Sequence, residues 1–485
     1  MTDQPRQPGD DDPQIPDALR RLLRDLTGSD EVDPQLARML SESGIGSMDP
    51  AALQAAMSQV QQMFTQPTGS AEEGGINPGA ATDVARKTVA AAGDEVVGDA
   101  ERLAVTEAAR IAGLWLDEVT AFEAPSAVPQ AWSRAEWVEA TMPQWVQLTA
   151  PVATGVGEAI AQAMQRQLGE LGGGGLPEGL PPGLLPPGAD PSMLMDQMRP
   201  MVARMSGSMF GVQTGQAVGA LAGETLTGTE VGLPLTPPHA LALLPANVAA
   251  FADGLEVDAD QPRIYLAARE SARLRLFEDV AWLGPQLTQA VQDYARDITI
   301  DTEGIEQRLS SVNPADAEAL QQALQDNLFQ PDPSPAQQAA LTRLETYLAL
   351  VEGWVDLVAD RACRGHLPQA DALGEAVRRR RATGGPAEKT FSALVGLQLR
   401  PRRLRDAANL WAAIEDRHGA SLRDAAWAHP DLAPTAADLD DPLGYVEQVA
   451  ARSSGGDDLD AELDRLLSGG GDDAEGGAAR PQPPA

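Results

Sequence analysis

Apolar residues dominate the stretch 264–282, which contains almost no helix-breaking residues. A helix with apolar residues on more than one face packs inside a protein rather than on its surface. The pattern therefore predicts a largely buried helix. The stretch also carries Arg269, Glu270 and Arg273. The two arginines are four residues apart and therefore share one face. The apolar positions are Ile264, Leu266, Ala267, Ala268, Ala272, Leu274, Leu276 and Phe277.

A second long helix is predicted over residues 342–363. Its carboxylates Glu352, Asp356 and Asp360 are four residues apart and share one face. Leucine, valine and tryptophan residues flank them, which indicates that the carboxylates are at least partly buried. Buried carboxylates need partners, because an isolated charge is costly to remove from water.

The helical period also holds over residues 16–26, 51–64, 81–168, 287–298 and 305–328. We therefore expect a mainly α protein, a multi-helix bundle with few or no strands. A turn-rich stretch at 228–245 is the one place where we expect a short extended segment. Four tryptophans in apolar helical surroundings are predicted to anchor packing between helices: Trp115, Trp132, Trp137 and Trp145.

Glycine recurs every fourth residue within the uncharged stretch 205–223. Each glycine costs a helix about 1 kcal/mol relative to alanine, so a row of them indicates a compensating contact. Such a row lets a second helix approach backbone to backbone, as in membrane helices. The stretch is long enough to span a bilayer, but its glutamine, threonine and serine residues favour a buried helix outside membranes. The glycines are Gly207, Gly211, Gly215, Gly219 and Gly223.

Composition divides the chain into five parts. Residues 1–80 are poor in packing side chains, and we expect mostly disorder with short helices there. An N-terminal helical part covers 81–167, and the Gly- and Pro-rich stretch 168–191 is a flexible insertion that excludes helix. Residues 192–454 form the helical core, and 455–485 form an acidic tail that we expect to be disordered.

The chain is strongly acidic: 36 basic and 71 acidic residues give a net charge of −35. This charge opposes nonspecific attraction to nucleic acids and to anionic membranes, so neither is an expected partner. A single cysteine, Cys363, excludes an internal disulfide framework. The N-terminus lacks the basic and then apolar run of a secretory signal. We therefore expect a cytoplasmic protein.

Four blocks of the sequence are distinctive: ALLPANVAAFADGL, RIYLAARESARLRLFEDVAWL, LVEGWVD and GPAEKTFSALVGLQLRPRRLRDAANLW. Together they resemble an actinobacterial family of zincin-like proteins described as zinc-dependent metalloproteases or hydrolases. One branch of that family is associated with the biosynthesis of a deazaflavin coenzyme. The resemblance covers residues 101–449 and implies a zincin-like metallopeptidase core.

Better-equipped members of the family carry His-Glu-x-x-His, in which two imidazoles one turn apart hold zinc and the glutamate activates its water. This chain has Arg269 and Arg273 at the histidine positions and retains the glutamate, Glu270, at the position of the general base. Relatives carry Glu-Gly-His where this chain has Glu-Gly-Trp beginning at Glu352, so the resemblance gives Glu352 the third-ligand position. These are degenerate ligand positions, and we expect no cofactor.

Guanidinium has no lone pair to donate and cannot coordinate a metal. Two guanidinium groups nevertheless carry together about the same positive charge as one zinc ion. One hypothesis is therefore a structural cluster in which salt bridges replace the metal and hold the two helices together. The alternative is that both arginines point to solvent and pair loosely. The cluster would comprise Arg269, Glu270, Arg273, Glu352 and Asp356.

Few other residues offer metal ligands. Cys363 and His366 form a Cys-x-x-His pair, which is a weak sign of a metal site on its own. His239 follows two prolines and would be a ligand only if the fold brought it to Glu270. The basic run 378–381 either forms a patch for an anionic ligand or RNA or, as we favour, pairs with the acidic excess.

These observations predict a protein of the zinc-dependent metalloprotease (hydrolase) family that lacks zinc and peptidase activity. Such a protein would act as a binding or regulatory module for an unknown protein or peptide partner. The alternative is an active hydrolase or zinc metallopeptidase that acts on an unknown substrate through non-standard ligands, with Glu270 as the base. The sequence does not determine the oligomeric state.

Overall fold

The computed structural model of the chain describes residues 75–126, 128–171, 191–236, 240–255, 257–296, 334–382, 386–395 and 403–449. The chain divides into two units. The smaller unit comprises Met1–Ala71 and Met164–Gln197, and of it only the end of one helix and the start of the next are described. All contacts given below lie in the larger unit, which comprises Glu72–Ala163 and Met198–Ala485.

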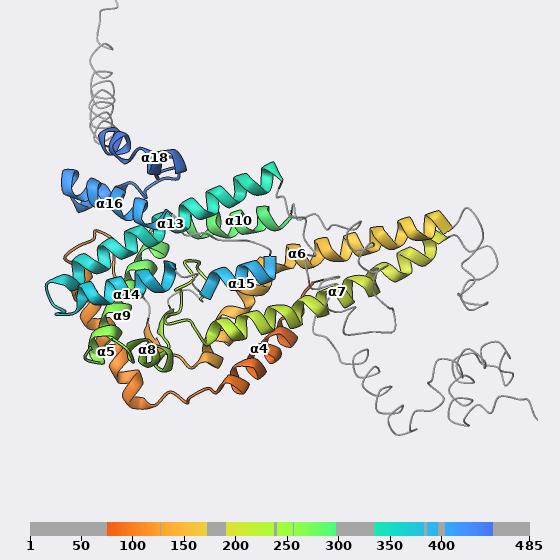
Figure 1. Cartoon of the computed structure of the whole chain (residues 1–485), viewed down its shortest axis with the longest axis horizontal. Helices are drawn as coiled ribbons and strands as arrows, with labels where there is room; N and C mark the ends of the chain where they lie inside the picture. The colour runs from red at the N-terminus through yellow and green to blue at the C-terminus, as the bar shows by residue number, and fades with distance from the viewer. Residues whose placement is uncertain are drawn as a thin grey trace, which may run out of the picture. The chain divides into compact units, whose positions relative to one another are not determined.

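The predicted mainly α fold is confirmed, since helices make up most of the described chain and only two short strands occur in it (Figure 1). In chain order the elements are α4 (Pro78–Ala92), α5 (Asp99–Leu116), β1 (Val128–Ala131), α6 (Arg134–Leu171), α7 (Pro191–Ala222), β2 (Ala240–Leu243), α8 (Pro245–Ala252), α9 (Asp260–Asp279), α10 (Leu283–Arg296), α13 (Pro335–Arg364), α14 (Ala370–Ala382), α15 (Pro386–Val395), α16 (Leu404–His418), α17 (Ala420–Ala425) and α18 (Ala436–Asp440).

Helix α9 lies at the centre of the larger unit. Every residue from Tyr265 to Leu276 is buried, as the continuous apolar pattern predicts for an enclosed helix. Helices α5, α8, α13 and α14 and strand β2 contact it. The helix ends at Asp279, whereas the sequence pattern continued to residue 282, because the backbone leaves the helical conformation at Val280.

Helix α13 packs along α9 and is the other long element of the core (Figure 1). It begins at a capping box, in which Ser334 accepts from the backbone of Gln337 and the Gln337 side chain accepts in return. Its buried face also contacts α10 and α16. Gly353 allows the close approach of α16, since a Cβ there would lie 2.7 Å from the backbone nitrogen of Ala408.

The two strands form a small parallel sheet in which Val128 pairs with Ala240 and Ala131 with Leu243. On the other side of β2, Gly228 donates its backbone N–H to Ala242, and Leu244 donates to Leu226. These bonds fix the segment 226–228 beside β2, against the buried face of α9. The short extended segment expected within 228–245 is therefore present as β2.

The glycine row of α7 packs against α4, which supplies the close contact that the sequence predicts. A Cβ on Gly215 would lie 2.5 Å from the carbonyl oxygen of Ala81, and one on Gly219 would lie 2.8 Å from that of Ala85. Both distances are too short for any side chain. Among the described residues, no helix is both long and apolar enough to cross a membrane.

The predicted tryptophan anchors lie in the core: Trp132, Trp137 and Trp145 are buried, and Trp115 is partly buried. Helix α6 continues through residues 168–171, where the sequence analysis places the start of the Gly- and Pro-rich insertion. Proline is tolerated in the first turn of a helix, and α7 accordingly begins at Pro191.

Some of the predicted parts lie outside the described residues. They are residues 172–190, the terminal parts 1–74 and 450–485, and the helix expected at 305–328.

Candidate functional site

Arg273 lies between Glu270 and Glu352 and donates hydrogen bonds to both. Its Nη1 donates to Glu270 Oε2 at 2.9 Å, within the same helix. Its Nε and Nη2 donate to the two oxygens of Glu352 on α13, at 3.0 and 3.2 Å. The second pair is a forked, bidentate contact, the strongest arrangement available to a guanidinium and a carboxylate. Arg273 therefore joins α9 to α13.

Arg269 makes a parallel connection one turn earlier on α9. Its Nη1 donates to Asp356 Oδ1 at 2.6 Å, and its Nη2 to Glu352 Oε2 at 3.3 Å. The side chains of Arg269 and Glu352 are each 4% exposed, and that of Asp356 is 15% exposed. The arginines therefore do not point to solvent. The structure brings together all five residues of the hypothetical cluster.

A third guanidinium, which the sequence analysis did not assign to the site, completes the arrangement. Arg381 from the last turn of α14 contacts Glu352 Oε2 through Nη1 at 2.6 Å. It also donates through Nη2 to the backbone carbonyl of Glu230 at 3.0 Å. The basic run 378–381 was visible in the sequence, but its spacing carries no information about which acidic residue it meets across the fold.

Glu270 is fully buried and accepts four hydrogen bonds. Besides Arg273, its donors are the hydroxyl of Thr227 at 2.7 Å, the hydroxyl of Thr229 at 2.9 Å and the backbone N–H of Thr229 at 2.9 Å. A Cβ on Gly228 would lie 3.0 Å from Glu270 Oε1, so glycine permits this approach. These threonines were also missed, because they lie in a turn segment without a regular pattern.

The buried charges balance. Three guanidinium groups, from Arg269, Arg273 and Arg381, face three carboxylates, from Glu270, Glu352 and Asp356. Arg378 extends the network toward the surface, with Nη1 3.1 Å from Asp356 Oδ2. We call the six balanced residues the ion-pair cluster.

The two glutamates of the ion-pair cluster have opposite pKa shifts. Burial alone would raise the pKa of Glu352, but Arg273, Arg381 and Arg269 outweigh it and lower the pKa to about 2. Burial raises the pKa of Glu270, and Arg273 and the two threonines oppose this rise only in part. Glu352 is therefore held firmly as a carboxylate, whereas Glu270 is the easier of the two to protonate.

The residues of this site do not fit a zinc ion. Arg269 and Arg273, which stand where the predicted motif would need histidines, carry guanidinium groups that cannot donate a lone pair. Both oxygens of Glu352, at the predicted third-ligand position, accept hydrogen bonds from arginine. Within the described part of the chain, no group of three or more His, Cys, Asp and Glu side chains is arranged to hold a metal ion.

The Cys-x-x-His pair does not form a metal site in this structure. Cys363 is buried, and burial raises the pKa of its thiol to about 12, which keeps the thiol protonated at neutral pH. His366 is exposed and stacks on Trp115, with ring centroids 4.5 Å apart. His239 lies outside the described residues.

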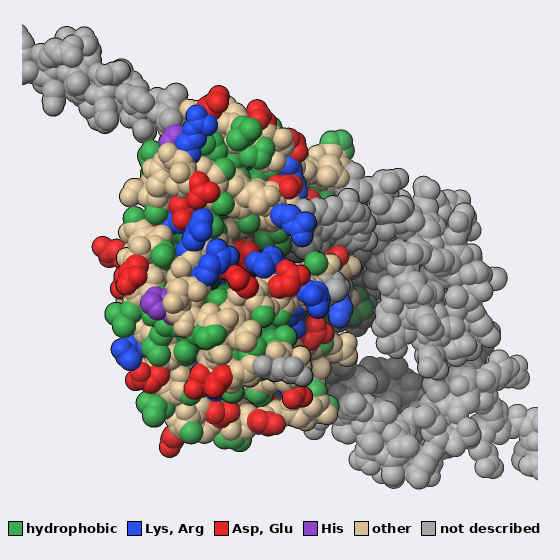
Figure 2. All heavy atoms as spheres, turned by 60° about the vertical axis from the view of Figure 1, so that its left-hand side comes forward, with side chains coloured by type: hydrophobic (Ala, Val, Ile, Leu, Met, Phe, Trp, Pro, Cys, Tyr) green, Lys and Arg blue, Asp and Glu red, His purple; other side chains and the backbone are tan. Residues whose placement is uncertain are grey.

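The basic run at the end of α14 pairs with acidic residues. Arg378 contacts Asp356, Arg380 contacts Glu230 at 3.3 Å, and Arg381 contacts Glu352. On the face of the molecule drawn in Figure 2, basic and acidic side chains are likewise interspersed. The arrangement agrees with pairing to the acidic excess rather than with a patch for RNA.

The profile of the zincin-like metallopeptidase family matches residues 76–446, a range that contains the whole ion-pair cluster. The chain belongs to this family. A crystal structure from Chloroflexus aurantiacus, described as "a putative hydrolase with a novel fold", is similar over 77% of this chain and 99% of that chain, with 15% identity and a TM-score of 0.52. At this identity the likeness concerns the fold alone. No curated protein matches the chain. The zincin-like resemblance is confirmed, while its actinobacterial branch and the deazaflavin label stay predictions.

Proposed function

We propose that this zincin-like protein binds no zinc at the family's metal position, has no peptidase activity there, and acts as a binding or regulatory module for another protein or peptide. The proposal rests on the surroundings of the Glu352 carboxylate. Three guanidinium groups surround this carboxylate. A metal ion would have to displace at least one of them and would leave that cation buried without its partner.

The position of Glu270 supports the absence of peptidase chemistry. A general base needs a free acceptor oxygen within hydrogen-bond reach of the proton that it removes. Both oxygens of Glu270 are instead engaged, and its side chain is fully buried. The alternative of an active hydrolase with non-standard ligands would need Glu270 to leave these four donors. It would also need a set of metal ligands, and the described residues form no group of three or more His, Cys, Asp and Glu side chains that could hold a metal ion.

The proposal is tested by restoring the family motif. The double variant Arg269→His and Arg273→His places two imidazoles one turn apart beside Glu352, the ligand set of a zinc peptidase. It also removes two of three positive charges from the ion-pair cluster, which leaves an excess of two negative charges that a divalent cation would neutralise. We expect the variant to retain zinc after dialysis and the unmodified protein to retain none, as measured by mass spectrometry of the metal content.

A matched variant separates ligand restoration from the simple loss of charge. Arg269→Gln with Arg273→Gln removes the same two charges without adding imidazoles and should not retain zinc. Near-stoichiometric zinc in the unmodified protein would overturn the proposal. That result would support the alternative, an active metallopeptidase that binds zinc through ligands other than those at the family positions.

A further inference from the structure

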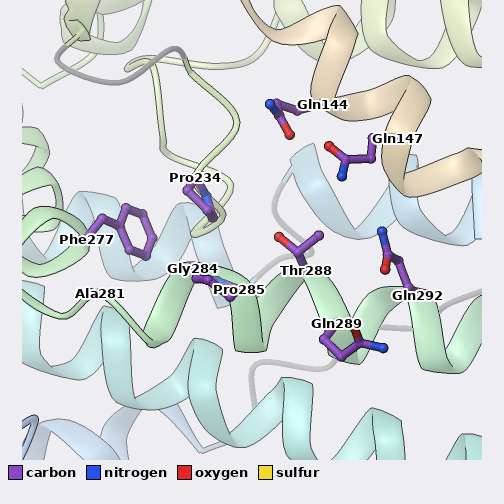
Figure 3. Close-up of a pocket in the computed structure, with 10 residues that line it drawn as sticks. All are labelled: Gln144, Gln147, Pro234, Phe277, Ala281, Gly284, Pro285, Thr288, Gln289 and Gln292. Atoms are coloured by element: carbon purple, nitrogen blue, oxygen red, sulfur yellow. The ribbon is translucent and has the colours of Figure 1, made fainter. Parts of the chain in front are cut away.

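A groove of about 520 Å³ lies on the surface, and Phe277, one helical turn after Arg273, is among its lining residues. Helices α6 and α10 form its two walls, and residues from the end of α9 and from the segment that follows Thr229 close one end (Figure 3). The volume falls within the range of about 300–1,000 Å³ that is typical of ligand sites. None of the six residues of the ion-pair cluster is among the described residues that line the groove.

The groove is uncharged although the protein is strongly charged. None of its ten described lining residues is acidic or basic, whereas 22% of the whole chain is. One part is lined by side-chain amides: Gln144 and Gln147 on α6 face Gln292 on α10 (Figure 3). These three amides make no hydrogen bond to the described part of the chain. Each is therefore available to donate one hydrogen bond and accept another, the same pair of bonds that a peptide group makes.

The other end of the groove is apolar. Phe277, Pro234 and Pro285 lie together there, away from the α6 amides (Figure 3). Phe277 follows Arg273 by one turn of α9, and Pro234 belongs to the segment that begins with Thr227 and Thr229. Through Glu270, which binds both threonines, the ion-pair cluster is connected to two of the three chain segments that form the apolar end.

We propose that this groove binds an uncharged, extended peptide segment of a partner protein. The main chain of the segment would pair with the amides of Gln144, Gln147 and Gln292, and one apolar side chain would enter the end formed by Phe277 and Pro234. Charged ligands are disfavoured, because no lining charge would compensate their desolvation. A saccharide is less suitable, because the one aromatic ring among the described lining residues lies away from the α6 amides that would bind hydroxyl groups.

The inference rests on the proposed binding function and names the partner surface that this function would recognise. The probes are acetylated and amidated heptapeptides of serine, glycine and glutamine with a central leucine, phenylalanine or alanine. Fluorescence anisotropy would measure their binding to the full chain. We expect the leucine or phenylalanine peptide to bind more tightly than the alanine peptide. We expect Gln147→Glu to weaken that binding about tenfold, because a carboxylate has no N–H to donate to the peptide carbonyl that the amide would bind.

The matched control is Gln338→Glu, which makes the same change of charge at an exposed glutamine of α13 outside the groove. It should leave peptide binding unchanged. The proposal is overturned if no peptide binds, if both variants weaken binding equally, or if chito-oligosaccharides bind in the groove in place of the peptides. Zinc content is measured separately. If no peptide binds, the proposed absence of zinc is not contradicted. If the protein retains zinc, the result of the peptide assay is not contradicted.

Discussion

Arg273 supplies one buried positive charge to carboxylates on two helices, Glu270 on α9 and Glu352 on α13. Arginine carries the cation itself, and its planar group presents donors to Glu270 and Glu352 at once. The side chain is 1% exposed. Loss of the guanidinium would leave two buried carboxylates without this partner, and the penalty for an uncompensated buried charge is large.

We therefore expect Arg273→Ala to lower the free energy of unfolding by about 3–5 kcal/mol. Arg273→Lys retains the charge but loses the forked geometry, so its loss should be smaller. Arg343→Ala is the control, because Arg343 pairs with Asp293 at the surface, where an ion pair contributes less than about 1 kcal/mol. Urea unfolding would compare the variants. If the losses in Arg273→Ala and Arg343→Ala were equally small, the ion-pair cluster would not hold α9 to α13.

At the same scale, the sequence predicted part of the site and missed part. The spacing of Arg269 and Arg273, and of Glu352 and Asp356, is local information, because residues four apart share a helix face. Arg381 and Thr229 reach the site from other segments, and their approach depends on how α14 and the turn after α7 pack. A single sequence contains no periodic signal for such contacts.

At the scale of elements, α7 shows that a weak helix former can be required by its neighbour. Glycine lowers helix propensity, yet at Gly215 it removes the side chain that would collide with α4. The carbonyl oxygen of Ala81 and the side chain of Val84 both lie within 3 Å of where a Cβ would stand. The sequence predicted the close contact from the four-residue period, but it could not identify α4 as the partner.

Two glycine-to-alanine variants should therefore change stability in opposite directions. Gly215→Ala gains helix propensity but must push α4 away, so we expect a net loss of about 1–3 kcal/mol, as for other overpacked sites. Gly113→Ala in α5 has no atom within 4 Å of the new Cβ, and it should gain up to about 1 kcal/mol. Thermal unfolding of both variants would test this. Stabilisation by Gly215→Ala would contradict the close packing of α4 on α7.

At the scale of the whole molecule, the chain belongs to the zincin-like family, and its two central helices are joined by ion pairs. The family profile spans 76–446, and the two central helices remain buried against each other. Six side chains whose formal charges sum to zero connect α9, α13 and α14. Helix periodicity gave the central elements and the mainly α fold, because burial leaves a regular pattern. The sequence contains no comparable regular pattern from which a function could be predicted.

The most direct test of this account is the free energy of unfolding of the tag-free protein, measured in urea with a chelator and again with added zinc. A ligand that binds only the folded state stabilises it, by about 2.7 kcal/mol at one hundred times its dissociation constant. We predict equal stability under the two conditions, because the ion-pair cluster already balances its own charges. Stabilisation by zinc that the chelator reverses would show that the folded protein still uses a metal, and it would contradict the account.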